Sequence, residues 1–456
     1  MNNSLGKEVT FLSLIKFTLP TIIMMVFFSL YTIIDGIFVS RYIGSNALSA
    51  INIVYPVICI LIGISVMMAT GGSAIVAKFM GEAKDKEARE SFTLITITSI
   101  IFGLIIAIFS LIFIKQIIYL LGSTDSLYEN SHTYLFTMLL FTPVIILKML
   151  FDYFLITAGN PNLGLLSAII GGVTNIILDY IFIYPMKMGV AGAGYATVFS
   201  QGISAVLCLF YIYRSMPDMW PEKHHWKLHA ADSRHQLSMG IPMALQFAIT
   251  ASGTMIMQAA INLVGSEAVA AFTAACKLQN LVTQGFSAMG QTMATYSGQN
   301  FGKGDIPRIK KGVRAALLTS ITYSIAAAVL VFLLLKPCLS LFFSGDVDMA
   351  AMMPWAKTYS YMCALFYVPL CTIFIFRNAM QGCGYGFLPM MGGVSELFAR
   401  LIVAVIAIKV ISYPLACFCD PAAWVTAAVF TGVSYLFVMK DIDKKYNSKI
   451  PTAPIS

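Results

Sequence analysis

Residues 163–184 read LGLLSAIIGGVTNIILDYIFIY, an almost unbroken apolar run that contains one charged side chain, Asp179. A helix that crosses the hydrocarbon core of a membrane needs about 20 predominantly apolar residues. This stretch is therefore long enough to span a bilayer as one α-helix. Within it Asn175 and Asp179 are four residues apart, so they share one face of that helix.

Apolar stretches of this kind fill the chain. The 456 residues are 58% hydrophobic and only 11% charged, whereas soluble domains carry about 25% charged residues. The stretches are long and continuously apolar, which excludes the short alternating strands of a membrane β-barrel. The sequence therefore predicts an all-α integral membrane protein with twelve transmembrane helices. They lie at about 11–39, 49–77, 92–121, 132–157, 163–184, 190–213, 237–264, 269–297, 315–335, 352–376, 387–411 and 421–439.

The two halves of the chain repeat each other at an offset of 221 residues. Residues 171–174 (GGVT) match 392–395 (GGVS), and 43–47 (IGSNA) match 264–268 (VGSEA). Six helices return the chain to its starting side, so the halves share one orientation and are expected to flank a central cleft. We predict an N-terminal lobe, a cytoplasmic linker, a C-terminal lobe and a cytoplasmic tail. Their bounds are 1–214, 215–236, 237–440 and 441–456.

The basic residues indicate how the chain is oriented. The chain has a net charge of +8, and its Lys and Arg residues cluster in the loops at 78–91, 214–236 and 303–314 and in the tail. An excess of Lys and Arg marks the cytoplasmic side of a membrane protein. We therefore expect a multi-pass protein of the cytoplasmic (inner) membrane with both termini in the cytoplasm. The positive charge is assigned to topology, and no nucleic-acid partner is predicted.

Two acids in the apolar stretches, Asp35 and Asp179, have no basic neighbour on their own helix. A charge at membrane depth is costly, so such residues usually have a function. Asn175 shares the face of Asp179, and Thr197 and Gln201 share a face of the next helix. Together they offer carboxylate, amide and hydroxyl oxygens, which suit a proton or a hard cation such as Na⁺. The alternative is a polar cluster that holds helices together.

Pro20 lies in the first helix, fifteen residues before Asp35. A proline inside a helix removes one backbone hydrogen bond and permits a bend. A first helix that bends at Pro20 and carries an acid near its far end could couple protonation to a change of shape. The simpler alternative is that Pro20 is a fixed kink and Asp35 an acid near the outer surface.

Two further acids have a base four residues away on the same helix. These pairs are Lys148 with Asp152 and Glu396 with Arg400, and both are expected to neutralise themselves. The 221-residue offset takes Asp179 to Arg400, so cation chemistry is predicted only in the N-terminal lobe. The pair of Lys148 and Asp152 remains a candidate substrate contact.

The eighth helix carries a polar stripe made of Lys277, Asn280, Gln284 and Gln291. The first three of these, with Gln201, are candidates for the substrate-facing surface of the cleft. Packing between the lobes is the alternative role for the stripe.

No enzyme motif is present in the sequence. The stretch nearest to a phosphate-binding loop, SGQNFGKGD at 297–305, lacks the first glycine and the final serine or threonine of that motif. No loop is long enough for a nucleotide-binding domain. We therefore expect no catalytic residue, no cofactor and no metal beyond a Na⁺ ion at Asn175, Asp179 and Thr197, and transport would draw on an ion gradient.

The chain resembles the multidrug and toxic-compound extrusion (MATE) family, in the bacterial branch with the MepA-type and DinF-type exporters. The resemblance covers the whole chain and is carried by Pro20 and Asp35, by TNIILDY at 174–180 and by GAGYATVFSQ at 192–201. It implies that Asp35, Asn175, Asp179 and Thr197 bind H⁺ or Na⁺ and that the first helix bends at Pro20.

One departure from that family pattern matters. NorM-type members carry acids in the seventh and tenth helices, whereas this chain has none between Met239 and Leu263 or between Lys357 and Arg377. A cation site of that kind in the C-terminal lobe is therefore not expected.

The resemblance implies a secondary active multidrug exporter of cationic amphipathic compounds, which exchanges them for H⁺ or Na⁺. Its partners would be those small molecules and membrane lipid, and a monomer with two complete lobes would suffice. The alternative is a flippase for lipid-linked substrates, which would use Lys148, Lys277, Arg377 and Arg400 as cations. A receptor or scaffold that transports nothing would explain neither the repeat nor the isolated acids.

Overall fold

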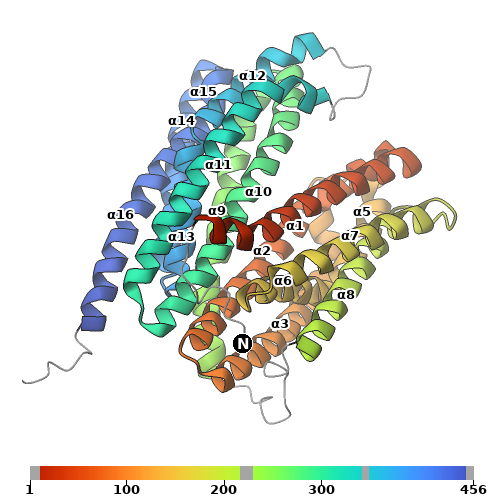
Figure 1. Cartoon of the computed structure of the whole chain (residues 1–456). Helices are drawn as coiled ribbons and strands as arrows, with labels where there is room; N and C mark the ends of the chain where they lie inside the picture. Colours follow the sequence, from red (N-terminus) through yellow and green to blue (C-terminus); the bar gives the residue numbers. More distant parts are fainter. Residues whose placement is uncertain (1–10, 216–229, 341–348, 448–456) are drawn as a thin grey trace, which may run out of the picture. The chain divides into compact units, whose positions relative to one another are not determined.

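The computed structural model describes residues 11–215, 230–340 and 349–447, and within these ranges the chain is helical with no strand (Figure 1). Its contacts divide it into two compact units. Unit 1 contains Leu19–Ala244, and unit 2 contains Leu245–Ser456 together with the start of the first helix, up to Thr18. The predicted linker was 215–236. Of this range, residues 216–229 lie outside the described part, and a helix already begins at Ala230.

Unit 1 is built from the first half of the sequence. Its elements in chain order are α1 (Phe11–Phe38), the π-helical turn η2 (Val39–Ile43), α2 (Ser45–Gly81), α3 (Asp85–Ile112), α4 (Ile114–Leu120), α5 (Asp125–Leu140), α6 (Thr142–Thr157), α7 (Pro161–Ile183) and α8 (Val190–Ser215).

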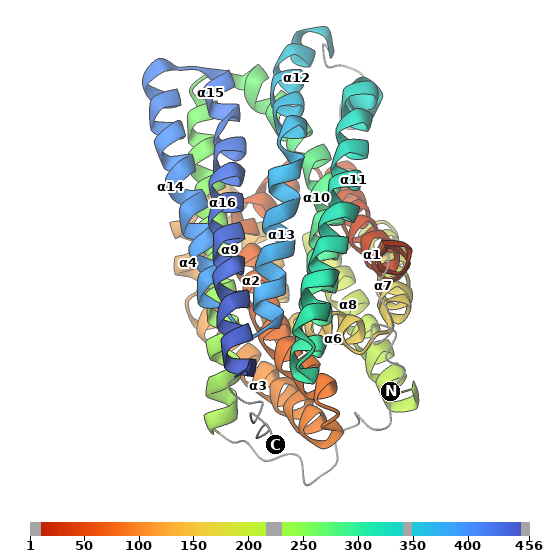
Figure 2. The same ribbon diagram turned by 60° about the vertical axis from the view of Figure 1, so that its left-hand side comes forward.

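Unit 2 is built from the second half. Its elements are α9 (Ala230–Asn262), whose first part up to Ala244 belongs to unit 1, α10 (Ser266–Lys303), α11 (Ile306–Ser340), α12 (Met349–Leu365), α13 (Tyr367–Gly382), α14 (Phe387–Val410), α15 (Tyr413–Cys417) and α16 (Cys419–Asn447). Within this unit α13 packs against α10, α11 and α16, and α14 packs along α16 (Figure 2).

The lengths of these helices agree with membrane spans. In the described residues nine helices are long and apolar enough to cross a membrane, and two bent pairs raise the number to eleven. The pairs are α5 with α6, bent by 56°, and α12 with α13, bent by 52°. The remaining predicted segment, 269–297, lies in the 38-residue α10. Its amide, hydroxyl and lysine side chains lower its hydropathy.

The repeat seen in the sequence is also present in the backbone. Gly44 and Gly265, which are 221 residues apart, cap the starts of α2 and α10 with φ values of 119° and 136°. Side chains other than glycine rarely adopt such φ values. Each unit therefore turns into its second long helix through the same glycine conformation.

Each unit has its own apolar core. In unit 1 the ring of Phe92, from α3, packs against that of Phe154, from α6, with ring centroids 4.0 Å apart. In unit 2 Phe286 lies beside Tyr323 and Tyr367. Many large apolar side chains are instead exposed, for example Phe109 and Leu333, as expected for helices that face lipid.

Candidate ion and ligand sites

The acids Asp35 and Asp179 are brought together where α1 crosses α7 in unit 1. A Cβ atom added to Gly172 of α7 would lie 2.4 Å from Cε1 of Phe27 and 3.0 Å from Cδ1 of Tyr31, both on α1. Only glycine permits this close approach of the two helices. Asp35 follows Tyr31 by one helical turn, and the carboxyl groups of Asp35 and Asp179 are near enough for each to act on the charge of the other.

The polar atoms at this crossing lack hydrogen-bond partners. Asp179 is 0% exposed and Asn175 is 1% exposed. Both carboxyl oxygens of Asp179, both amide atoms of Asn175 and Oδ1 of Asp35 are buried without a partner. Buried polar groups are nearly always hydrogen-bonded, and leaving one unsatisfied costs free energy. A group of five such atoms on two helices is therefore the arrangement expected where a proton or cation binds.

A tyrosine that the sequence analysis did not single out also belongs to this cluster. Tyr134 of α5 is buried, and its hydroxyl lies in the field of Asp35, Asp179 and Tyr55. A phenol can donate a hydrogen bond to a carboxylate or accept one from a carboxylic acid. The sequence holds 21 tyrosines, and spacing along α5 gave no reason to choose this one.

The remaining predicted ligands lie on α8, which packs along α7. The hydroxyl of Thr197 donates to the carbonyl oxygen of Ala193 at 3.0 Å, so its hydrogen is used within the helix. The hydroxyl oxygen of Thr197 keeps its lone pairs, which could bind a cation. Oε1 of Gln201 is buried without a partner.

Pro20 is buried inside α1, which runs as one helix from Phe11 to Phe38. The division between the two units falls between Thr18 and Leu19, directly before this proline. The hinge at Pro20 stays a prediction. Pro20 is, however, the second residue of the part of α1 that belongs to unit 1.

Lys148 and Asp152 form the ion pair predicted from their spacing. Nζ of Lys148 lies 2.5 Å from Oδ2 of Asp152, and both side chains are buried. The same ammonium group lies 5.7 Å from the ring centroid of Phe28 on α1. Because Oδ1 of Asp152 has no partner, the pair retains one acceptor for a ligand.

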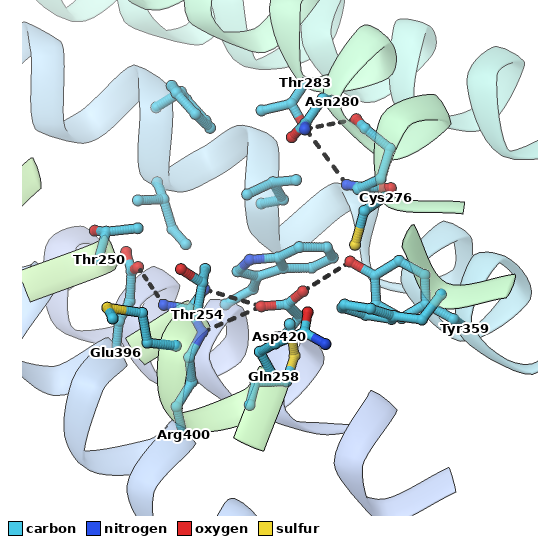
Figure 3. A pocket seen from close by; sticks show the side chains of 18 of the residues that line it. Thr250, Thr254, Gln258, Cys276, Asn280, Thr283, Tyr359, Glu396, Arg400 and Asp420 are labelled. Atoms are coloured by element: carbon cyan, nitrogen blue, oxygen red, sulfur yellow. Dashed lines mark hydrogen bonds and ion pairs between the residues drawn. The ribbon is translucent and has the colours of Figure 1, made fainter. Parts of the chain in front are cut away.

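In unit 2 the predicted pair of Glu396 and Arg400 is part of a larger network (Figure 3). Glu396 accepts from Nη2 of Arg377 at 2.6 Å, and its second oxygen lies 3.6 Å from Nη1 of Arg400. Nη2 of Arg400 lies 3.0 Å from Asp420, which also accepts from the hydroxyl of Tyr359 at 2.9 Å. The predicted pairing of Glu396 with Arg400 is therefore present, and Arg377 and Asp420 extend it.

The sequence analysis missed Asp420 because the twelfth segment was taken to begin at 421. Its partner Arg400 is on α14, so no spacing along one helix relates the two residues. Arg377, on α13, is likewise joined to Glu396 between helices. Such pairs are set by tertiary packing.

The network forms part of the wall of a cavity of about 580 Å³ in unit 2. Asn280, from the predicted polar stripe of α10, lines this cavity, whereas Lys277 and Gln284 do not. Gln279, which the stripe did not include, does line it and accepts a hydrogen bond from Tyr367 at 2.8 Å. Of the three stripe residues named as substrate candidates, Asn280 alone lines this cavity, and the role of the stripe stays a prediction.

These features define a multi-pass membrane protein made of two repeated helical units with buried, unpartnered acids in the first. The sequence profile of the MatE family matches residues 20–181 and 242–431. The chain belongs to this family, whose members are transporters and not enzymes.

Three relatives show what the chain is similar to. The probable multidrug resistance protein YoeA of Bacillus subtilis is 22% identical over 72% of this chain and 72% of its own. The multidrug export protein MepA of Staphylococcus haemolyticus is 24% identical over 58% of each chain. The FAD transporter of Shewanella oneidensis is 24% identical over 74% of this chain and 75% of its own.

Solved structures show the same fold. The structure described as MATE in the straight conformation has a TM-score of 0.88 and 19% sequence identity. The match covers 97% of this chain and 99% of that one.

Proposed function

We propose that this protein is a secondary active exporter of amphipathic cationic compounds, coupled to the inward movement of H⁺ or Na⁺. The observation that carries the proposal is the group of unpartnered polar atoms on Asp35, Asn175 and Asp179 in unit 1. The names of the relatives YoeA and MepA, both described as multidrug proteins, support the choice of substrate.

The ion would act through the contact between α1 and α7. An ion bound between Asp35 and Asp179 removes the repulsion of two nearby carboxylates and links the two helices. Without it, that repulsion favours separation of α1 from α7. An ion can shift the protein between two shapes only by binding one more tightly than the other. This crossing provides such a difference, and Pro20 would let α1 bend between the two shapes.

Thr197 and Gln201 would complete the oxygen set for Na⁺, whereas a proton needs the carboxylates alone. Lys148, which is paired with Asp152, lies over the ring of Phe28 on α1, and this pair would contact substrate. In unit 2, the side chains of Asn280, Lys277 and Gln284 would contact substrate. We place the protein in the cytoplasmic membrane with its basic loops inside, and one chain with two units would act as a monomer.

Drug resistance in cells tests the proposal. Cells that express Asp35→Asn or Asp179→Asn at the wild-type level should lose resistance to cationic dyes and antiseptics. Wild-type resistance in either variant would count against ion coupling at this site. Lys336→Gln, which changes an exposed charge in unit 2, is the control.

Flipping of lipid-linked substrates is the second candidate, but the structure favours it less. A pyrophosphate headgroup carries several negative charges and needs a surplus of cations, whereas Lys148, Arg377 and Arg400 are each paired with an acid. A flippase should fail when both Lys277 and Arg377 are replaced and should tolerate Asp179→Asn. The exporter, in contrast, should fail with Asp179→Asn.

A further inference from the structure

The unit 2 cavity differs in chemistry from the ion site of unit 1. Its charged lining residues are Arg377, Glu396, Arg400 and Asp420, and these two cations and two anions neutralise each other. The cavity therefore has no surplus negative charge to attract a cation.

Two donor groups in this wall lack an acceptor within hydrogen-bond distance, whereas both carboxylates are already used. Glu396 accepts from Arg377, and Asp420 accepts from both Arg400 and Tyr359. Nε of Arg377 and Nη1 of Arg400, in contrast, are buried with no hydrogen-bond partner. The two residues are 7% and 3% exposed. A buried guanidinium N–H without an acceptor carries a desolvation cost that a ligand oxygen would remove.

Aromatic side chains form much of the remaining wall. Phe272, Tyr359, Phe374 and Trp424 line the cavity, and Thr250 and Thr254 lie near the charged network (Figure 3). A volume of about 580 Å³ falls within the roughly 300–1,000 Å³ of typical small-molecule sites. The cavity thus offers aromatic surface beside unsatisfied cationic donors.

We propose that this cavity binds an aromatic compound that carries an anionic oxygen group, a carboxylate or a phosphate. The anionic group would accept hydrogen bonds from Arg377 and Arg400, and the rings would pack against Trp424 and Phe272. Guanidinium groups suit this role because they donate from a planar fork to two oxygens of one anion. The ammonium group of an amphipathic cation could accept no hydrogen bond from these donors.

This inference goes beyond the proposed export of cations and does not rest on it. The cavity lies wholly within unit 2, and its ligand would bind in the absence of an ion gradient. Asp179→Asn should therefore abolish export and leave this binding unchanged, so failure of one proposal leaves the other intact.

Calorimetric titration of the detergent-purified full chain tests the assignment with matched probes. Naphthalene-2-carboxylate is compared with its neutral carboxamide and with naphthalene-2-methylamine, a cation of the same body. Riboflavin 5′-phosphate is compared with riboflavin. The anion of at least one set should bind about tenfold or more tightly than its neutral partner, as charge-assisted hydrogen bonds imply. Preference for the anion in the naphthalene set would identify a carboxylate ligand, and preference in the riboflavin set would identify a phosphate ligand.

Two variants locate the site. Arg377→Lys keeps the positive charge beside Glu396 but lacks Nε and the planar fork, so the preference for the anion should vanish. Asn280→Trp fills the cavity without touching the network and should weaken binding of every probe, which keeps the test valid if Arg377→Lys fails to fold. Arg214→Lys, at the exposed end of α8, is the matched control and should bind as the wild type does.

The opposite results would overturn the assignment. One is equal affinity for the anion and its neutral partner in both probe sets. Another is tighter binding of the amine than of the carboxylate. The third is anion binding that is unchanged in Asn280→Trp.

Discussion

Asp179 and Arg400 stand 221 residues apart at equivalent places in α7 and α14, and their surroundings are opposite. Both carboxyl oxygens of Asp179 are buried without a hydrogen-bond partner. Arg400 is joined to Asp420 at 3.0 Å and lies 3.6 Å from Glu396. The duplicated fold therefore holds an unsatisfied acid in one unit and a neutralised network in the other.

This difference predicts opposite effects of the same substitution on stability. Asp179→Asn removes a buried charge that has no partner, so the melting temperature should stay level or rise. Asp420→Asn leaves Arg400 without its closest partner and should cost about 3–5 kcal/mol, as loss of one member of a buried pair does. The melting temperatures of both variants, measured in the same detergent, check this prediction. A larger decrease for Asp179→Asn than for Asp420→Asn would contradict it.

The pair of Arg377 and Glu396 should show strong coupling in a double-mutant cycle. Each single change to Met strands a buried charge and should cost about 3–5 kcal/mol, whereas the double change removes both charges and should be close to neutral. The free energy of unfolding of the four proteins gives the coupling. Additive losses would mean that the contact at 2.6 Å contributes little.

The packing of α13 on α10 should depend on Gly382. A Cβ atom at this position would lie 2.2 Å from the carbonyl oxygen of Ala294, a backbone atom that cannot turn aside. Gly382→Ala should therefore destabilise unit 2 by about 1–3 kcal/mol, the usual cost of overpacking. Gly432→Ala is the control, because its Cβ would lie 3.6 Å from Phe376; equal stability of the two variants would contradict the packing.

The approach of α1 to α7 should matter for transport. Gly172→Ala places a methyl group 2.4 Å from the ring of Phe27, so it should push α1 away and reduce export. Gly164→Ala on the same helix meets Met24 at 3.7 Å, an ordinary contact, and should export normally. Dye efflux rates at equal expression compare the two, and unimpaired export by Gly172→Ala would show that the crossing is not needed.

Much of this architecture could be predicted from the sequence, because it depends on short-range rules. The membrane-spanning helices could be predicted from the lengths of the apolar runs. The division into two units could be predicted from the sequence repeat at an offset of 221 residues. The spacing of Lys148 and Asp152 gave their ion pair, which the structure confirms.

The parts of the sites that depend on packing between helices could not be predicted. Tyr134 joins Asp35 and Asp179 from α5, and Asp420 reaches Arg400 from α16. No periodicity along one helix relates these residues. Gln279 of α10 is a similar case, because its hydrogen bond from Tyr367 of α13 joins two helices.

The most direct test of the account is uptake of a fluorescent cationic dye into proteoliposomes. The lumen is made more acidic than the outside, and Na⁺ is absent. The account predicts that the wild type accumulates dye and that Asp179→Asn, with equal protein in the membrane, does not. Uptake by the wild type only after a Na⁺ gradient replaces the pH gradient would assign the site to sodium. Equal uptake by Asp179→Asn, or none under either gradient, would contradict export driven by an ion at Asp35 and Asp179.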